Sequence, residues 1–337
     1  MAMRKTIGVL VWAALLAGPG ARAQEAGGAK PTEAQKPPGK RLLVHFQETR
    51  ERGGVRAVSR PSSLLLHADS EPARLFVGTQ LAITQNEKET TTTQFKNAGI
   101  AVQVGVSALP DGVYRVDVEY ENSQRRGLAV ERAPGPVTAG NPVLQVVKAK
   151  SALTLREGER VPFASAVDPV TGEVVRVDLT LAPAPPPKPA VSDARGATRL
   201  RAQLVLVRRQ GQTTLARRPY ALILLPDGAN GDRVQVFSGS QLPVQTRTGN
   251  NQITVALKDV GAGLIMGSRP LEDGRYQLSV EFSDGVLSPG EGAPELHVFE
   301  SQAVLVVCQG ETVTLASAVD PQTGDVVEAE LTLEALK

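Results

Sequence analysis

The 337-residue sequence contains a single cysteine, Cys308, so an internal disulfide framework is excluded. Aromatic residues make up only 4% of the chain, and the histidines are three: His45, His67 and His297. Acidic and basic residues nearly balance at a formal net charge of +2, which excludes a general attraction to nucleic acid or anionic lipid. No segment shows a sustained helical pattern of apolar residues. Abundant Val, Leu, Ile and Thr instead favour β-strands.

The one long apolar run lies near the N-terminus, from Ile7 to Ala17, directly after a basic start. It is followed by Ala21-Arg22-Ala23, and together these features predict a secretory signal peptide cleaved after Ala23. The run is shorter than the roughly 20 residues of a membrane-spanning helix, although an uncleaved anchor is the alternative. Cleavage would change the formal net charge from +2 to −1. We therefore expect a periplasmic or secreted protein with no transmembrane helix in the mature chain.

A repeated stretch organises the rest of the sequence. Residues 142–181 align without a gap with residues 294–333, and 20 of these 40 positions are identical. Both copies contain an Asp-Pro-x-Thr-Gly turn, which begins at Asp168 in the first copy and at Asp320 in the second. Asp-Gly turns that precede alternating strands also recur. The sequence therefore predicts a duplicated module.

Alternating apolar residues and regularly spaced turns predict two tandem antiparallel β-sandwich-like domains joined by a Pro-rich linker. The predicted segments are, in order, a signal peptide at 1–23, a disordered tether at 24–40, β-domain 1 at 41–181, a Pro-rich linker at 182–197 and β-domain 2 at 198–337. Because the linker is dense in proline, we expect it to be extended and to hold the two domains apart. The loop at 122–141 differs in length from its counterpart, so we expect it to be exposed.

The two acidic turns are the candidate binding sites. Asp168 with Glu173, and Asp320 with Asp325, could bind calcium or a sugar. Calcium takes about six to eight oxygen ligands, and two carboxylates supply few of them. Asp, Pro and Gly also suit a tight turn, so we favour a structural role for these residues and leave binding open.

Catalytic signatures are missing from the sequence. The histidines have no accompanying cysteine or Glu-x-x-His motif, so satisfied or exposed histidines are favoured over metal ligands. There is no nucleophile elbow, phosphate-binding loop or dinucleotide fingerprint. We predict no catalytic residue, no cofactor and no metal.

Two further groups of residues could serve either in binding a partner or in the structure of the domain. Arginine pairs could form an anion- or partner-binding patch, but solvated strand ends are favoured; they are Arg125-Arg126, Arg208-Arg209 and Arg217-Arg218. Aromatic residues recur at matching positions and are expected to pack in the core; they are Tyr114 with Tyr276, and Tyr120 with Phe282.

Several motifs resemble a known family. Val77-Gly78 opens one strand, Phe95 to Val104 forms another, and Asp111-Gly112 begins a third. The second copy matches more closely at Leu242-Pro243-Val244 and Asp259-Val260-Gly261. These segments resemble the Val-Gly-x-x-x-Pro-Ile and aromatic-x-Asp-Val-Gly motifs in the core β-domain of bacterial type II/III secretion secretins. Two segments occupy the place of the family's closing Asp-Gly-Glu: Glu157-Gly158-Glu159 and Gln309-Gly310-Glu311.

The resemblance implies a short, duplicated, secretin-like exported protein. Secretins carry several periplasmic ring domains and membrane-inserting hairpins, whereas this sequence adds the Asp-Pro-x-Thr-Gly hairpin. We therefore expect a non-enzymatic envelope protein that acts in protein–protein interaction or scaffolding, with protein partners in the bacterial envelope or further copies of itself. The alternatives are a calcium- or carbohydrate-binding β-sandwich module and, less favoured, a secreted hydrolase.

Overall fold

The computed structural model describes residues 39–87, 90–126, 143–168, 171–185, 199–225, 233–247, 253–288 and 295–336. The predicted signal peptide, nearly all of the tether and most of the linker lie outside these ranges. The described residues are almost entirely β-strand, so the all-β prediction is confirmed. No helix among them is long and apolar enough to cross a membrane.

Each half of the chain supplies eight strands. Repeat 1 contains β1 (Arg41–Arg52), β2 (Val55–His67), β3 (Ala73–Glu87), β4 (Thr90–Ala108), β5 (Val113–Arg126), β6 (Val143–Arg156), β7 (Arg160–Val167) and β8 (Val174–Pro183), with a 3₁₀ turn, η2 (Pro110–Gly112), between β4 and β5. Repeat 2 contains β9 (Arg199–Gln210), β10 (Thr213–Leu224), β11 (Val234–Arg247), β12 (Ile253–Pro270), β13 (Tyr276–Ser288), β14 (Glu295–Val307), β15 (Thr312–Val319) and β16 (Val326–Leu336).

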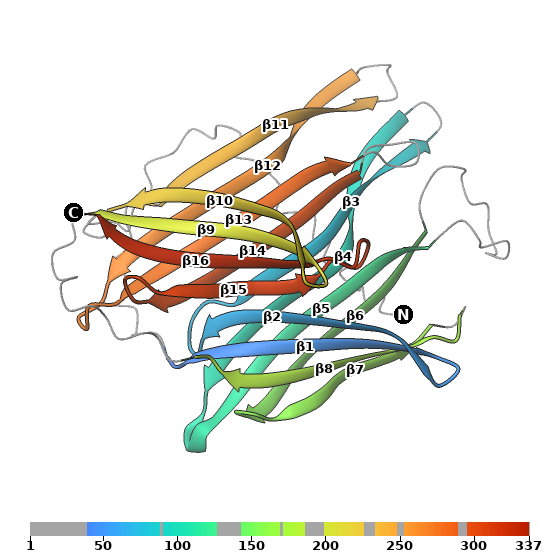
Figure 1. Cartoon of the computed structure of the whole chain (residues 1–337). Coiled ribbons are helices and arrows are strands. Elements are labelled where there is room, and N and C mark those ends of the chain that lie inside the picture. The colour runs from blue at the N-terminus through green and yellow to red at the C-terminus, as the bar shows by residue number, and fades with distance from the viewer. Residues whose placement is uncertain are drawn as a thin grey trace, which may run out of the picture. The chain divides into compact units, whose positions relative to one another are not determined.

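The strands form two antiparallel sheets of eight (Figure 1). Sheet A has the order β10-β9-β16-β15-β2-β1-β8-β7, and sheet B has the order β11-β12-β13-β14-β3-β4-β5-β6. The order within repeat 1 is therefore the same as the order within repeat 2 in both sheets. Each repeat contributes four neighbouring strands to each layer.

The two repeats are joined edge to edge, at what we call the repeat junction. In sheet A, β15 pairs with β2, and in sheet B, β14 pairs with β3 over seven residue pairs. The expectation that the Pro-rich linker holds the halves apart is therefore wrong. An exposed strand edge carries unpaired N–H and C=O groups, and pairing across the junction satisfies them.

The predicted linker also begins too early. Ala182 and Pro183 belong to β8 and pair with Leu43 and Leu42 of β1. Pro183 is the last residue of this strand, a position at which proline is tolerated in a sheet. One further boundary differs: residues 122–126 of the predicted loop lie in β5. The rest of that loop lies outside the described residues.

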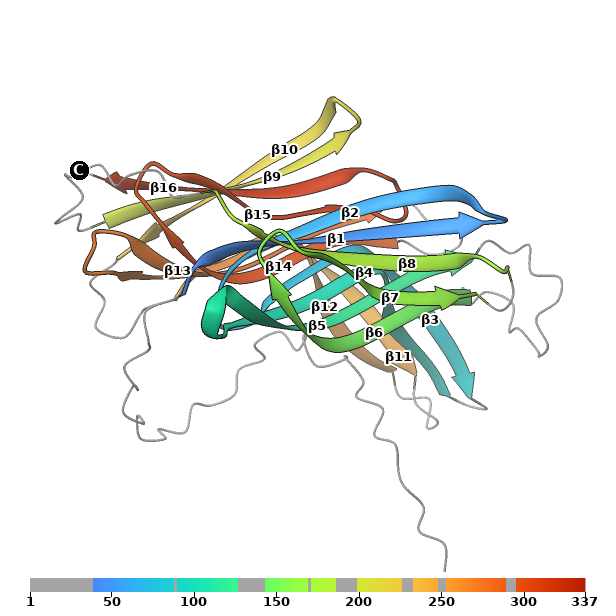
Figure 2. The same ribbon diagram turned by 90° about the horizontal axis from the view of Figure 1, so that it is seen from below.

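The core lies between the two sheets. Alternate residues of each strand point inward, as Leu42 and Val44 do in β1 and Val102 and Val104 do in β4. One continuous cluster of buried apolar residues includes side chains from both sheets and from both repeats. Figure 2, seen at right angles to Figure 1, shows the strands of sheet A covering those of sheet B.

A second, smaller apolar cluster lies at the repeat junction, on the other face of sheet B. Phe76 of β3 packs there with Val260 of β12 and with Leu296 and Val298 of β14. Phe76 belongs to this cluster, whereas its neighbours Leu75 and Val77 belong to the core between the sheets. The side-chain period of a strand explains this division. The junction therefore combines backbone pairing with apolar contact between the repeats.

Candidate interaction site

Both acidic turns have the geometry of a tight reverse turn. Asp168 N–H donates to the Glu173 carbonyl, and Gly172 N–H donates to the Asp168 carbonyl, each at 2.8 Å. Asp320 makes the same two bonds in repeat 2. Gly172 has a φ of 69°, which a glycine adopts without strain. The structural role of the Asp and Gly residues in these turns explains why they recur in both repeats, and this explanation requires no ligand.

No group of three or more His, Cys, Asp or Glu side chains gathers in the described ranges in a way that could hold a metal ion. Each turn carboxylate contacts its own repeat instead. Asp168 accepts a hydrogen bond from Gln145 at 2.7 Å, and Asp320 lies 3.8 Å from His297. Arg208 lies 3.7 Å from Asp320.

The three histidines lie in different surroundings. His67 is buried, its Nδ1 lies 2.9 Å from the Gly39 carbonyl, and its Nε2 accepts the Val306 N–H at 3.0 Å. Burial, as the largest cause, lowers the pKa of His67, so the neutral ring fits this role. His45 is exposed and faces Ser63 across the sheet, so the two histidines of repeat 1 do not meet. His67 is a satisfied histidine that ties β2 of repeat 1 to β14 of repeat 2.

A buried polar network in repeat 1 was missed by the sequence analysis. Glu48 accepts hydrogen bonds from Tyr120, Asn122, Arg50 at 2.6 Å and Arg60 at 3.4 Å. Burial raises the pKa of Glu48, but the charge of Arg50 and the hydrogen bonds lower it by more, so the carboxylate has a pKa below its ordinary value. The network is thus a charged, hydrogen-bonded part of the core.

Repeat 2 also contains a carboxylate that pairs with an arginine, but the carboxylate lies at a different position. The equivalent residues are Leu206 for Glu48, Phe282 for Tyr120 and Asp284 for Asn122. Asp284 pairs with Arg218, the counterpart of Arg60, at 2.6 Å. The carboxylate has moved from the first strand of the repeat to the fifth while the arginine has stayed. Comparing the two copies position by position would have revealed this exchange.

Most residues of the predicted arginine patches already have acidic partners within the chain. Arg125 pairs with Glu295 at 2.6 Å, and Arg209 pairs with Glu328 at 2.7 Å. Arg208 faces both carboxylates of the second acidic turn, at 3.7 and 3.6 Å. Because these arginine side chains are already paired with carboxylates, their charges are not free to bind an anion.

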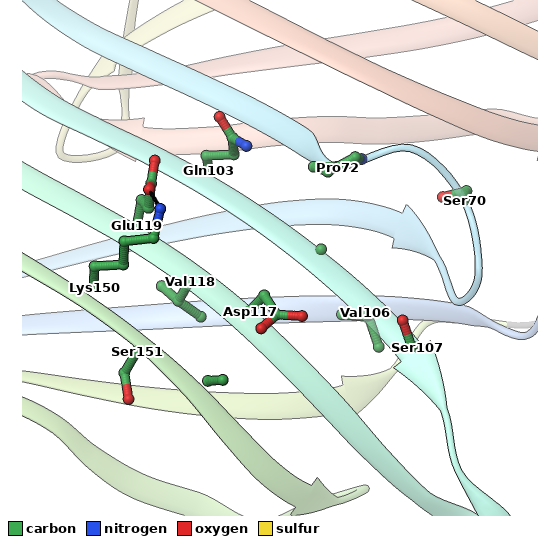
Figure 3. Close-up of a pocket in the computed structure, with 12 residues that line it drawn as sticks. Ser70, Pro72, Gln103, Val106, Ser107, Asp117, Val118, Glu119, Lys150 and Ser151 are labelled. Atoms are coloured by element: carbon green, nitrogen blue, oxygen red, sulfur yellow. Dashed lines mark hydrogen bonds and ion pairs between the residues drawn. The ribbon is translucent and has the colours of Figure 1, made fainter. Parts of the chain in front are cut away.

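One shallow groove lies on the outer face of sheet B, over β4, β5 and β6 (Figure 3). Pro72 borders it on one side, and Gly105 leaves the space that a larger side chain would fill. Lys150 pairs with Glu119, and Asp117 pairs with Arg115 at 3.2 Å. Because each charged side chain that lines it already has a partner, the groove offers no free charge to anchor a ligand.

Open strand edges lie at the two ends of the double layer. At one end β10 and β11 are the outermost strands, and at the other end β7 and β6 are. Among the described residues, the outer sides of β6, β7 and β10 pair with no strand, and β11 makes only the single bridge Arg247–Thr91. Strand edges of this kind are templates for pairing with another chain.

Apolar side chains are exposed at these ends. Ile223 on β10 and Phe237 on β11 are 46% and 49% exposed, and Val146 on β6 and Val167 on β7 are 45% and 63% exposed. Apolar side chains are also exposed away from the edges, among them Val55, Val255 and Leu257, but at the two ends they lie beside unpaired backbone groups. The two ends are therefore the candidate interaction site.

Comparison with known proteins shows which family part of the chain resembles. The family model described as Secretin, bacterial type II and III secretion system protein, matches residues 49–164. No curated protein sequence matches the chain. The matched segment includes most of repeat 1, from the end of β1 into β7.

Solved secretin structures are also similar to the chain. The Salmonella injectisome secretin InvG shares 10% identity over 46% of this chain, with a TM-score of 0.31. The Pseudomonas aeruginosa secretin XcpQ shares 12% over 89%, with a TM-score of 0.29, and the Escherichia coli K12 secretin GspD shares 12% over 88%, with a TM-score of 0.27. The chain covers 67%, 59% and 50% of these three structures, respectively. The resemblance expected from the motifs is confirmed: residues 49–164 match the secretin family of bacterial type II and III secretion systems.

Proposed function

We propose that the protein is an exported, non-enzymatic component of the bacterial envelope that binds other proteins through the edges of its secretin-like sheets. The observation that carries this proposal is the pair of open sheet ends, with exposed apolar residues on all four edge strands. The secretin match over residues 49–164 supports a likeness to secretion proteins, and the N-terminal Ile7–Ala17 run supports export.

Binding through strand edges uses two sources of affinity. Backbone N–H and C=O groups of the edge extend the ladder into the partner, and alternate side chains give specificity. Val146 and Phe237 are placed for the second role because they lie on edge strands and are exposed. No catalytic step is part of the proposal.

Site-specific photo-crosslinking in intact cells tests the proposal. A photo-reactive phenylalanine at position 146 or 237 of the full chain should give protein adducts after irradiation. The matched control is Val55, which is 70% exposed but lies at the turn between β1 and β2. Adducts at the edges and none at the control, together with recovery in the envelope fraction, are the expected result. A cytoplasmic chain, or edges that crosslink no more than the control, would contradict the proposal.

A further inference from the structure

We propose that the repeat junction contains an acid-sensitive latch, in which the neutral ring of His67 holds the two repeats together and a proton on that ring releases its hold. The latch consists of the His67 ring and its two partners, the Gly39 carbonyl just before β1 and the Val306 N–H in β14. It lies where the two repeats meet, not at the open ends of the sheets, so it is a property beyond the proposed binding function.

The two hydrogen bonds fix the protonation state of the ring. The Val306 N–H can only donate, so Nε2, 3.0 Å away, must accept through its lone pair. Nδ1 then carries the proton of a neutral ring and donates to the Gly39 carbonyl at 2.9 Å. An imidazolium has a proton on both nitrogens, so it keeps the bond to Gly39 and loses the bond to Val306. Protonation therefore breaks the bond of the latch that joins repeat 1 to repeat 2.

Val306 depends on this ring because the neighbouring strand of repeat 1 stops short of it. β3 pairs with β14 from Leu296 to Gln302 and ends four residues before Val306. Val306 is 2% exposed, so water does not replace a lost acceptor. A buried backbone N–H without an acceptor is strongly unfavourable, and a side chain of repeat 1 satisfies this one. The bond is thus a direct link between the repeats, formed in addition to the strand pairing.

The surroundings of the ring favour its neutral form. Arg41 in β1 and Arg275, directly before β13, are the cations that act on it, and Glu311, directly before β15, is the carboxylate. Glu311 is already bonded to Arg41, at 2.7 Å. Burial is the largest cause that lowers the pKa of His67, and the two arginines lower it further, against the opposing effects of the Gly39 carbonyl and Glu311. The ring therefore stays neutral at neutral pH and takes up a proton only in acid.

The direction of the pH effect follows from this pKa. When the junction opens, water reaches His67, and the pKa of the ring returns to its ordinary value of 6.5. The open state therefore binds the proton more readily than the latched state. The latch contributes its full stability above pH 6.5 and loses it as the pH falls below that value.

Comparison of the repeats shows that the histidine is specific to the junction. The counterpart of His67 is Leu225, since Leu66 corresponds to Leu224. Leu66 and Leu224 are both buried in the core, whereas Leu225 is 54% exposed. Leu225 lies directly after β10, and among the described residues no strand pairs with the outer side of β10. The two repeats thus keep the core residue and differ at the next position, where only repeat 1 has a neighbouring repeat to hold.

A second histidine at the junction provides an internal control. His297 of β14 lies 3.2 Å from the hydroxyl of Thr79 in β3 and 3.8 Å from Asp320. A hydroxyl both donates and accepts, and a proton on His297 would face a carboxylate, so acid breaks no contact here. The counterpart of His297 is Gln145, and His297→Gln is therefore a substitution that repeat 1 already accommodates.

Hydrogen exchange of the full chain, followed by mass spectrometry and corrected for the intrinsic effect of pH, tests the latch. Between about pH 7.5 and about pH 5, residues 303–307 of β14 should lose protection at least about fivefold, the loss expected for one buried hydrogen bond. Residues 102–106 of β4 lie between strands of repeat 1 and should keep their protection.

Three variants assign the effect to a residue. His67→Gln keeps an acceptor that takes up no proton, so residues 303–307 should be protected alike at both pH values. His67→Leu, which introduces the residue of repeat 2, removes the acceptor, so the same residues should be weakly protected at both. His297→Gln should respond to acid as the wild type does.

Equal protection of residues 303–307 in the wild type at both pH values would overturn the latch, as would an equal loss in residues 102–106. An acid response that persists in His67→Gln, or that disappears in His297→Gln, would assign the response to another group and refute the role of His67. If His67→Gln does not fold, full protection of residues 303–307 in His67→Leu at about pH 7.5 would still refute the hydrogen bond to Val306.

Discussion

The buried network around Glu48 gives the sharpest test of how the core is held together. Glu48→Leu removes the carboxylate that Arg50 and Arg60 share, and it leaves the Tyr120 hydroxyl and the Asn122 amide without their acceptor. Glu48 is 1% exposed, so water does not replace the lost partner. Removing one member of a buried ion pair costs about 3–5 kcal/mol in the free energy of unfolding, and we expect a loss in this range.

Repeat 2 supplies the compensating changes. Tyr120→Phe and Asn122→Asp, combined with Glu48→Leu, reproduce the arrangement in which Asp284 pairs with Arg218. The new aspartate would face Arg60, while Arg50 keeps Glu173 at 3.3 Å. We expect the triple variant to recover about 2 kcal/mol or more of the loss, because residues in one network couple strongly.

Urea unfolding followed by far-UV circular dichroism measures these differences. Glu51→Leu is the matched control, since Glu51 lies on the same strand but pairs with Arg176 near the surface, at 3.6 Å. The control should change the unfolding free energy by about 1 kcal/mol or less. The reasoning is refuted if Glu48→Leu unfolds like the control, or if the two added changes fail to recover any stability.

Three further predictions concern acid, packing and thiol reactivity. Because the pKa of Glu48 in the folded protein lies below its ordinary value of 4.5, its ion pairs stabilise the fold at neutral pH and lose this effect as acid protonates the carboxylate. The difference in urea midpoint between Glu48→Gln and the wild type should therefore shrink as the pH falls below that value, and a constant difference would contradict this. Gly99→Val should destabilise the protein strongly in thermal melts, since a Cβ there would lie 2.3 Å from the Val77 carbonyl oxygen, whereas Gly105→Ala, with its nearest contact at 3.6 Å, should be tolerated. Cys308 is 2% exposed and burial raises the pKa of its thiol, so a disulfide reagent at about pH 8 should react only after denaturant is added; immediate reaction of the native protein would refute its burial.

Local patterns in the sequence predicted local structure well. The Asp-Gly turn at 111–112 takes positive φ at both residues, 62° and 69°, as the dipeptide indicated. The alternation of apolar residues that predicted strands is seen in β4, where Val102, Val104 and Val106 are buried and the residues between them are partly buried. These features depend only on neighbouring residues, so one sequence contains the information for them.

The way in which the two repeats join could not be predicted from the sequence. Phe76 and Phe237 occupy equivalent positions, yet one is buried and the other half exposed, because only the first has a strand beside it. Which edges meet is decided by contacts between residues more than 200 positions apart, such as Phe76 and Leu296. The predicted loop likewise began at Asn122, although this residue lies in β5 and its partner Glu48 lies on another strand.

The matching strand order of the two repeats has an evolutionary consequence. A module whose one side complements its opposite side needs no new surface to gain a neighbour in the same polypeptide. Duplication of the gene segment alone then yields a longer protein whose halves already fit, and covalent linkage lets the contact between them form without any dependence on concentration.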